Sequence, residues 1–310
     1  MTEKADKKKS KFKSPNMDAT IFNRDLLRLR RDKTAGQFEN HAFLLKEVTE
    51  RLLDNLDDIK RDFRKVLNIG GHHQLMQKYF DNALLIDQDL SFHKISALKK
   101  PVIQADEEFL PVKNNSLDLI FFALNLHWIN DLPGALVQIF NSLKPDGLFI
   151  GASLGGETLF ELRASMMKAD IERLGGIRPH ASPLMDVRDA GGLLQRAGFT
   201  LPVVNTERIT VTYSNAFALM KELKGMGENN ALIKGYKGLT TAAHMMRVAE
   251  IYSEDFANED GRIPVTFDIL YFQGWSPHES QQKPLKPGSA KMSLKDALGK
   301  TPPIQNKEPS

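Results

Sequence analysis

The 310-residue sequence contains no cysteine. This absence excludes disulfide bonds, thiolate metal sites and a cysteine nucleophile. No apolar stretch reaches the ~18 to 20 residues that a membrane-spanning helix requires, and the longest one, around residues 117–126, is interrupted by Asp118 and Asn125. The sequence therefore predicts a globular protein without a transmembrane segment. Its apolar fraction of 41% is sufficient for a sizeable core.

Net charge is nearly absent outside the N-terminal segment. The formal charge of the whole chain is +3, and residues 1–13 alone hold six lysines against Glu3 and Asp6, which is +4. Residues 1–20 therefore predict a disordered basic tail, which allows peripheral contact with a membrane surface. This tail lacks the apolar core of a secretory signal and the arginines of a transit peptide, which favours a cytoplasmic protein. Residues 276–310, rich in proline, lysine and serine, predict a second disordered tail.

Between the tails, residues 21–275 predict one domain in three parts. Two helices are expected within 21–60, an α/β half over 61–152, and a second half with a helical insert over 153–275. The first helix, over 21–36, is amphipathic and rich in arginine. Such a helix either lies over a ligand cleft or docks a partner.

One segment, residues 66–90, has the order strand, glycine turn, helix, strand and acid. Its first four residues predict a buried strand, because a short apolar run that stops at Gly70 and Gly71 is too short for a helix. Residues 83–86 predict the next strand, with Asp87 at its carboxyl end. A right-handed crossover places the glycine turn and this acid at one edge of the sheet, where α/β proteins bind ligands. The pattern fits a nucleotide site, and a purely structural unit would look the same.

The alternation of strands and helices continues along the chain. Residues 102–112 predict a short strand that ends in Asp106 and Glu107, at the same edge as the glycine turn. Further strands are predicted at 117–122, 148–152, 202–213 and 265–275, a turn at 144–147, and helices at 187–197 and 242–256. Strands separated by helices predict an α/β fold with a mostly parallel sheet covered on both faces. The last two strands indicate an antiparallel pair that closes the sheet.

Several motifs in this order resemble those of class I S-adenosylmethionine-dependent methyltransferases. They are the glycine turn, the acid after the second strand, the acids at 105–107, the strand that runs into LHWIND, and LKPDGLFI. The chain is most similar to one family among them: the mitochondrial complex I assembly factor described as an arginine hydroxylase and its bacterial relatives, near the malonyl-carrier-protein methyltransferase of biotin synthesis. That closer resemblance rests on ADEEFLP, LHWINDLPGAL, GGETLFELR, GGIRPHASP and KGMGENN, and spans about Ile21 to Ser280.

The resemblance implies a Rossmann-like class I methyltransferase fold with a mostly parallel seven-stranded sheet, an antiparallel closing pair and helical insertions. It implies S-adenosylmethionine as cofactor, bound by the half over 61–152, and a substrate half over 153–275. In the family the glycine turn packs on the methionine and ribose, the first acid binds the ribose hydroxyls, and the next acids bind the adenine amino group. The fourth strand ends facing the methyl group. The implied cofactor-binding residues are Gly70, Gly71, Asp87, Asp106, Glu107 and Leu124.

The glycine turn departs from the family pattern. Family members usually have an acid followed by glycine at three alternate positions, whereas this chain has Asn68 for the acid and His72 and Gln74 for the second and third glycines. A side chain at positive φ costs about 1 to 2 kcal/mol, and such a cost weakens binding by only about tenfold or somewhat more. We therefore expect cofactor binding to survive.

Polar residues flanked by glycines follow the fifth strand and indicate a substrate pocket. They are Glu157, Thr158, Arg163 and His180, and His127 after the fourth strand is a further candidate for catalysis. The alternative interpretation is structural, because an acid near a helix start stabilises the helix dipole and an arginine one turn later forms local pairs.

No metal site is predicted. A non-haem iron site needs two histidines and a carboxylate, and the sequence holds no H-x-D or H-x-E pair. The neighbouring His72 and His73 diverge by about 100° on a helix, so they cannot easily bind one ion. The fourth strand also lacks the N-P-P-Y type of motif found in methyltransferases that act on nucleic-acid bases, so we expect no nucleic-acid partner.

Three functions fit these observations. The resemblance favours modification of an arginine, by hydroxylation or methylation, in a protein substrate or client that is a respiratory-complex subunit. A second function is O-methylation of a small molecule or a carrier-bound carboxylate. A third is a scaffold that binds a client protein after the altered turn has lost the cofactor. Retained acids favour the first two functions, and the altered turn favours the third.

Overall fold

The computed structural model describes residues 20–282 apart from 97, 99–100, 236–237 and 239. Contacts divide the chain into one unit up to Pro277 and a second from His278 onward. Both predicted tails lie largely outside the described residues, so their disorder stays a prediction. Within the described ranges, none of the helices combines the length and the apolar character needed to cross a bilayer.

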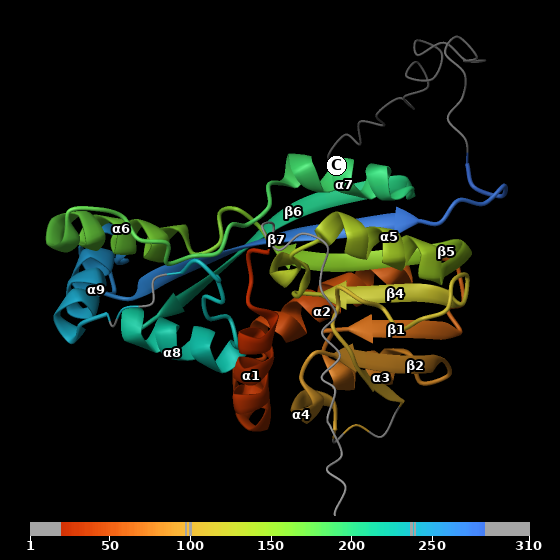
Figure 1. Cartoon of the computed structure of the whole chain (residues 1–310), viewed down its shortest axis with the longest axis horizontal. Coiled ribbons are helices and arrows are strands. Elements are labelled where there is room, and N and C mark those ends of the chain that lie inside the picture. The colour runs from red at the N-terminus through yellow and green to blue at the C-terminus, as the bar shows by residue number, and fades with distance from the viewer. Residues whose placement is uncertain (1–19, 97, 99–100, 236–237, 239, 283–310) are drawn as a thin grey trace, which may run out of the picture. The chain divides into compact units, whose positions relative to one another are not determined.

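A seven-stranded sheet organises the first unit, with the strand order β3-β2-β1-β4-β5-β7-β6. Its strands are β1 (Lys65–Ile69), β2 (Leu84–Asp89), β3 (Val102–Gln104), β4 (Leu117–Ala123), β5 (Leu143–Leu154), β6 (Thr200–Tyr213) and β7 (Ile263–Trp275). The first five strands pair in parallel, and β7 lies antiparallel between β5 and β6 (Figure 1). This arrangement confirms the predicted mostly parallel sheet with an antiparallel closing pair.

Helices cover both faces of the sheet. They are α1 (Arg24–Thr34), α2 (Phe43–Asp57), α3 (His73–Tyr79), α4 (Phe92–Ile95), α5 (Leu132–Ser142), α6 (Phe160–Leu174), α7 (Val187–Ala197), α8 (Ala216–Met226) and α9 (Ala242–Phe256), with short 3₁₀ helices η2 (Ala35–His41) and η3 (Leu126–Trp128). Along β4, Leu119 and Phe121 pack with α2 and α3, and Ile120 and Phe122 pack with α5 and α7. Because side chains alternate between faces, burial on both faces makes the strand continuously apolar.

Two predicted boundaries were wrong. The second strand does not end before Asp87: β2 continues to Asp89, and Asp87 pairs in register with Asn68 of β1. The predicted turn at residues 144–147 lies inside β5, where the register against β4 shifts and Asp146 has a φ of 62°. At Asp87 the ladder with β1 continues across a polar residue that looks like a strand end in the sequence, whereas residues 144–147 bulge out of the ladder between Leu143 and Leu148.

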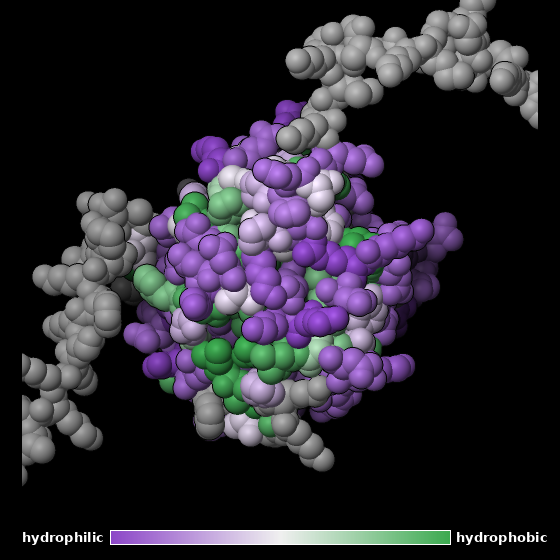
Figure 2. Space-filling model, turned by 90° about the vertical axis from the view of Figure 1, so that its right-hand side faces the viewer, coloured by the Kyte–Doolittle hydropathy of each residue, from purple (hydrophilic) through white to green (hydrophobic). Residues whose placement is uncertain are grey.

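The parallel strands end at one edge of the sheet, and the helices that carry the site lie beyond that edge. There, α6 and α9 lie beside each other near the ends of the long strands β6 and β7, and α1 and α8 lie closer to β1 and β4 (Figure 1). At the opposite end, where the parallel strands begin, the surface is mainly hydrophilic, with a large hydrophobic patch in the lower part of the view and smaller ones at its sides (Figure 2). Because α/β proteins bind ligands at the carboxyl ends of their parallel strands, the candidate site is expected at the edge beside α1, α6, α8 and α9.

Candidate functional site

The glycine turn after β1 is packed closely against the end of β4. Gly70 has a φ of +78°, and a Cβ at this position would lie 2.6 Å from the carbonyl oxygen of Ala123 and collide with the side chain of Asn125. A Cβ on Gly71 would collide with Asn68. Packing therefore requires both glycines, and at Gly70 the backbone conformation requires glycine as well.

Asn68 closes the turn in place of the acid usual in methyltransferases. Its Oδ1 accepts the backbone N–H of Gly71 at 3.0 Å, and its Nδ2 donates to the carbonyl oxygen of Gly71 at 3.1 Å and to Asp87 Oδ1 at 2.6 Å. The amide can donate and accept at once, which a carboxylate cannot. The substitution therefore keeps the turn anchored.

A small cavity lies beside the glycine turn, and Gly70, Leu124 and Asn125 line it. His72 does not line this cavity. Its backbone N–H donates to Thr49 Oγ1 at 3.1 Å, and its ring is buried with Nε2 3.3 Å from Glu39 Oε2. Burial lowers the pKa of His72 below its ordinary value, although Glu39 opposes the shift. The side chain at Gln74 is exposed. Neither residue that replaces a family glycine fills the cavity.

Asp87 lies within β2 rather than at the edge of the sheet. Its side chain is fully buried, accepts from Asn68 and lies 3.0 Å from His73 Nδ1. The acid at the carboxyl end of β2 is Asp89, whose Oδ1 accepts the backbone N–H of Ser91 at 2.8 Å. Asp89 was not predicted, because the apolar run of the strand stops at the first acid, Asp87. The predicted placement of Asp87 is corrected accordingly.

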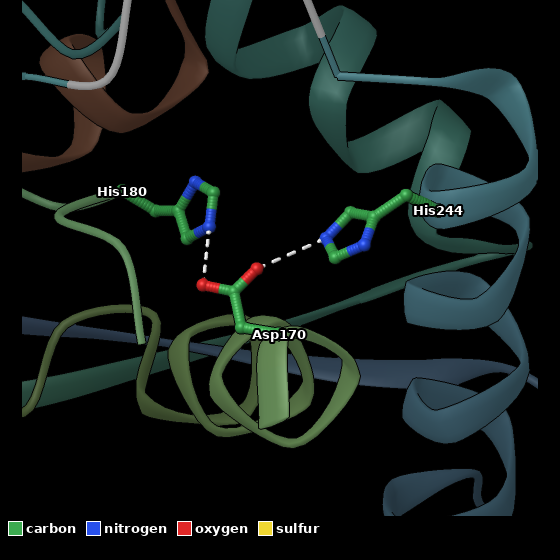
Figure 3. Close-up of side chains that lie close together, drawn as sticks. All are labelled: Asp170, His180 and His244. Carbon is green, nitrogen blue, oxygen red and sulfur yellow. Dashed lines mark hydrogen bonds and ion pairs between the residues drawn. The ribbon is translucent and has the colours of Figure 1, made fainter. Parts of the chain in front are cut away.

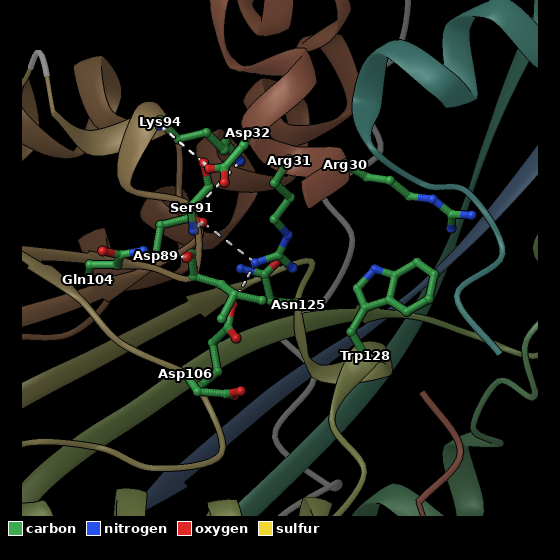
Figure 4. A network of polar contacts seen from close by, with 12 residues as sticks. Arg30, Arg31, Asp32, Asp89, Ser91, Lys94, Gln104, Asp106, Asn125 and Trp128 are labelled. Atoms are coloured by element: carbon green, nitrogen blue, oxygen red, sulfur yellow. Dashed lines mark hydrogen bonds and ion pairs between the residues drawn. The ribbon is translucent and has the colours of Figure 1, made fainter. Parts of the chain in front are cut away.

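Arginines of α1 bind the polar groups at the ends of β2, β3 and β4 (Figure 4). Arg31 donates to Glu107 Oε1 at 2.7 Å and to Asn125 Oδ1 at 2.9 Å, and lies 3.6 Å from Asp89 Oδ1. Burial alone would lower the pKa of Arg31, but Glu107 and Asp89 outweigh it and raise that pKa. The same helix therefore covers the predicted ligand edge, as the first interpretation of the 21–36 segment proposed.

Arg24 makes a second bridge from α1 to these acids. Its Nη2 donates to Asp106 Oδ1 at 2.6 Å and also binds Glu107. Burial on its own lowers the pKa of Arg24, and Glu107 and Asp106 more than reverse that effect. The predicted adenine-binding pair is thus held by protein charges in this conformation.

Two neighbouring cavities lie beside this edge. The smaller, of about 50 Å³, is lined by Gly70, Leu124 and Asn125 among others. The larger, of about 270 Å³, is bounded by residues of η3, α6 and α8. They share three lining residues: Leu44, Leu154 and Glu228. A ligand at the glycine turn and a ligand in the larger cavity would therefore be neighbours.

The larger cavity brings together most of the predicted substrate residues. Its lining includes His127, Thr158, Arg163 and His180. Arg163 donates from Nη2 to the carbonyl oxygen of Gly156 at 2.6 Å, a local contact that also fits the structural interpretation.

Glu157 was wrongly predicted to join this pocket. Its side chain is exposed and does not line the cavity. Its backbone N–H donates to Asp268 Oδ2 at 3.3 Å, and the buried Thr158 next to it donates from Oγ1 to the carbonyl oxygen of Asp268 at 3.0 Å. These contacts fix the loop to β7 and turn the two side chains in different directions.

Glu228 supplies a carboxylate to the wall that both cavities share. The helix α8 ends at Gly227, whose φ of +85° turns the chain so that the N–H of Glu228 donates to the carbonyl oxygen of Leu223 at 2.9 Å. Oε2 of Glu228 lies 3.1 Å from His127 Nε2. Burial alone would raise the pKa of Glu228, but His127 and Arg31 bring it below the ordinary value. The residue was not predicted, although it lies in the KGMGENN motif.

Asp170, His180 and His244 come together beside the larger cavity, although the sequence predicted no metal site (Figure 3). One potential ligand atom from each residue lies within 4.8 Å of the others. The patterns considered in the sequence were ligand pairs one or two positions apart, such as H-x-D. Here His180 and His244 are 64 residues apart and meet only because α6 and α9 pack together.

Comparison with known proteins identifies the family. A methyltransferase domain family matches residues 67–151. The arginine-hydroxylase NDUFAF5 of Danio rerio is 42% identical over 293 residues, which cover 91% of each chain, and the human protein is 44% identical over 90% of this chain and 84% of its own. The chain belongs to the NDUFAF5 arginine-hydroxylase family. A malonyl-[acyl-carrier protein] O-methyltransferase of Gallionella capsiferriformans is 30% identical over 84% of this chain and 93% of its own.

Membership confirms the predicted resemblance and the class I methyltransferase fold, whose general property is the binding of S-adenosylmethionine. The residues at the sheet edge fit such a ligand in kind. Gly70 and Asn125 line the smaller cavity, and the buried Nδ2 of Asn125 has no hydrogen-bond partner in the described ranges. The buried Oδ2 of Asp89 makes no hydrogen bond there either and lies 3.4 Å from Nζ of Lys94, which lines the same cavity. Such atoms are costly to bury and would gain from a ligand. For a cofactor to bind Asp106 and Glu107, it would have to replace Arg24 and Arg31 as the partners of these acids.

Proposed function

We propose that the protein is an assembly factor that binds S-adenosylmethionine and modifies an arginine side chain of a respiratory complex I subunit. The relatives that are 42% and 44% identical over 91% and 90% of the chain are named arginine-hydroxylases. The observation that carries the proposal for this chain is the carboxylate of Glu228 in the wall between the two cavities. A positively charged guanidinium in the larger cavity would pair with it, and the planar fork of arginine suits a carboxylate.

The rest of the larger cavity suits the stem of an arginine side chain. Its walls are mainly apolar, formed by leucines, Met166, Met220 and Phe267. Arginine buries its aliphatic stem on apolar surface while its charged end seeks a partner. A substrate arginine would therefore extend through this cavity toward Glu228, next to His127. The reaction would take place where the larger cavity meets the smaller one, which Gly70 of the glycine turn lines.

The cofactor would be held by residues at the sheet edge. Gly70, Leu124 and Asn125 would contact its methionine end, and Asp89 replaces Asp87 as the candidate for the ribose hydroxyls. Asp106, with Glu107 beside it, remains the candidate for the adenine amino group. When bound, the cofactor supplies an electrophilic methyl group.

Two measurements test the cofactor part. Calorimetric titration with S-adenosylmethionine and S-adenosylhomocysteine should show binding by the wild-type protein, and Asp89→Asn should weaken it by about 1.5 to 3 kcal/mol, the scale of a lost hydrogen bond to a charged group. An unchanged affinity would remove Asp89 from the ribose site. Asp87→Asn, folded as judged by circular dichroism, is the comparison for the earlier assignment.

The substrate part is tested with arginine-containing peptides from complex I subunits, followed by mass spectrometry. The reaction contains S-adenosylmethionine as methyl donor, and dioxygen with a reductant as the source of an oxygen atom. The modified peptide should increase in mass by one oxygen atom or by one CH₂ unit, which decides between hydroxylation and methylation. Glu228→Gln should abolish peptide binding. Glu222→Gln is the matched control, because Glu222 lies on α8, the helix that precedes Glu228, and its Oε2 is paired with His41 Nδ1 at 2.7 Å. Equal loss in both variants would argue against a guanidinium site at Glu228.

A scaffold function without cofactor is favoured by one observation. Arg24 and Arg31 already bind the acids that a cofactor would need. Absence of binding at millimolar cofactor by a folded sample would support this second function, and binding of a complex I subunit by that sample would then be the measurement to make.

A further inference from the structure

We propose that Asp170, His180 and His244 bind a divalent transition-metal ion at the wall of the larger cavity. The three residues come from separate elements: Asp170 from α6, His180 from the loop that follows it, and His244 from the first turn of α9. Both imidazole rings point at the one carboxylate (Figure 3). Nε2 of His180 lies 2.9 Å from Asp170 Oδ2, and Nε2 of His244 lies 3.1 Å from Asp170 Oδ1.

The carboxylate is buried and incompletely satisfied. Asp170 has no exposed surface, and its Oδ1 lies 3.1 Å from His244 Nε2 without the geometry of a hydrogen bond, so this oxygen makes no hydrogen bond among the residues that the structure describes. Its Oδ2 accepts the backbone N–H of Arg178 at 2.8 Å. A buried carboxylate oxygen without a hydrogen bond is unfavourable. A cation bound by Oδ1 would satisfy it, while the N–H of Arg178 would continue to orient the other oxygen.

The donor set selects the class of ion. Two imidazoles and one carboxylate suit iron, zinc and other first-row divalent metals, whereas calcium and magnesium prefer oxygen ligands. With metal–ligand bonds of about 2.1 Å, adjacent ligands of an octahedral ion lie roughly 3 Å apart. The 3.1 Å contact of His244 with Oδ1 is close to this spacing. His180 lies 2.9 Å from the other oxygen, Oδ2, and one ligand atom from each of the three residues lies within 4.8 Å of the others. Three protein ligands would leave coordination positions for water or substrate.

The loop that carries His180 is held in place. Nδ2 of Asn230 donates to the carbonyl oxygen of His180 at 2.9 Å and to that of Pro179 at 3.1 Å. His180 also lines the larger cavity, which Asp170 and His244 do not. The metal would therefore lie behind the cavity wall, beside the proposed arginine site. The inference adds a metal to that site, but metal binding itself requires neither cofactor nor peptide.

The test uses the full chain, stripped with a chelator and titrated with Fe²⁺ without oxygen and separately with Co²⁺, whose visible absorption reports imidazole and carboxylate ligation. We expect one equivalent to bind. Loss of a residue that merely orients a ligand lowers metal affinity 10- to 100-fold, so His180→Ala and His244→Ala should each lower it at least tenfold. His127→Ala is the matched control, because His127 is also a buried cavity histidine paired with a carboxylate, at 3.1 Å.

Binding of one equivalent that both variants lose and the control keeps would support the site. Binding that persists in folded His180→Ala, or no binding to the folded wild-type chain, would overturn it and leave a hydrogen-bonded aspartate between two histidines. If His244→Ala does not fold, the partly exposed His180 gives a variant that decides the question alone. Since no peptide or S-adenosylmethionine is present, a negative result leaves the arginine-modification proposal standing.

Discussion

Replacing Glu107 by glutamine should destabilise the protein and release α1 from the sheet edge. Glu107 has no exposed surface and binds both Arg24 and Arg31, the latter at 2.7 Å. Removing one partner of a buried ion pair costs about 3 to 5 kcal/mol because the remaining charge stays buried. Arg31 keeps contacts with Asn125 and Asp89. We therefore expect a loss near the lower end, about 3 kcal/mol.

Urea denaturation followed by circular dichroism measures this loss. The midpoint should fall while the slope stays constant, because the surface exposed on unfolding does not change. Asp25→Asn is the control: Asp25 is exposed and lies 3.5 Å from Arg28, so its loss should cost no more than about 0.5 kcal/mol. Trypsin should also cleave α1 faster in Glu107→Gln. A stability equal to that of the control would refute the idea that this buried network holds α1 in place.

Three further changes test the turn and the cavity. Gly70→Ala should lose about 1 to 2 kcal/mol from positive φ alone, and more from the collision with Asn125, with weaker S-adenosylmethionine binding by calorimetry; unchanged stability would contradict the packing. The pKa of His72 is lowered in the folded state, so the unfolded chain binds a proton at this histidine more readily. The free energy of unfolding should therefore fall as pH drops from about 7.5 through the ordinary histidine pKa of about 6.5. His72→Gln should show a smaller fall between these pH values in denaturant titrations. Arg163→Ala should impair peptide modification and leave cofactor affinity intact, and loss of both would indicate a folding defect.

The sequence alone was sufficient for most of the fold. The segment 242–256 was predicted as a helix and forms α9, and 187–197 was predicted and forms α7, which ends at Gly198. The segment 117–122 was predicted as a strand and forms β4 with one further residue. These elements follow from local periodicity, caps and glycine, which a single sequence displays. The motifs in their order also predicted the family.

The position of the cofactor acid needed the tertiary structure. Whether β2 stops at Asp87 or at Asp89 depends on pairing with β1. There, Nδ2 of Asn68 donates a hydrogen bond to the buried side chain of Asp87. Polar residues normally indicate the end of a buried strand, so the predicted strand ended at Asp87 instead of at Asp89. The ladder between strands decided the boundary.

The sequence by itself determined that this is an α/β protein of the methyltransferase class, because periodicity and turn residues are local properties. Only the tertiary structure decided which side chains share a site. It excluded Glu157, brought Glu228 to the cavity wall, and gathered Asp170 with two histidines from different elements. Contacts between residues distant in the sequence depend on how helices pack on one another and on the sheet. No spacing within the sequence reports that packing.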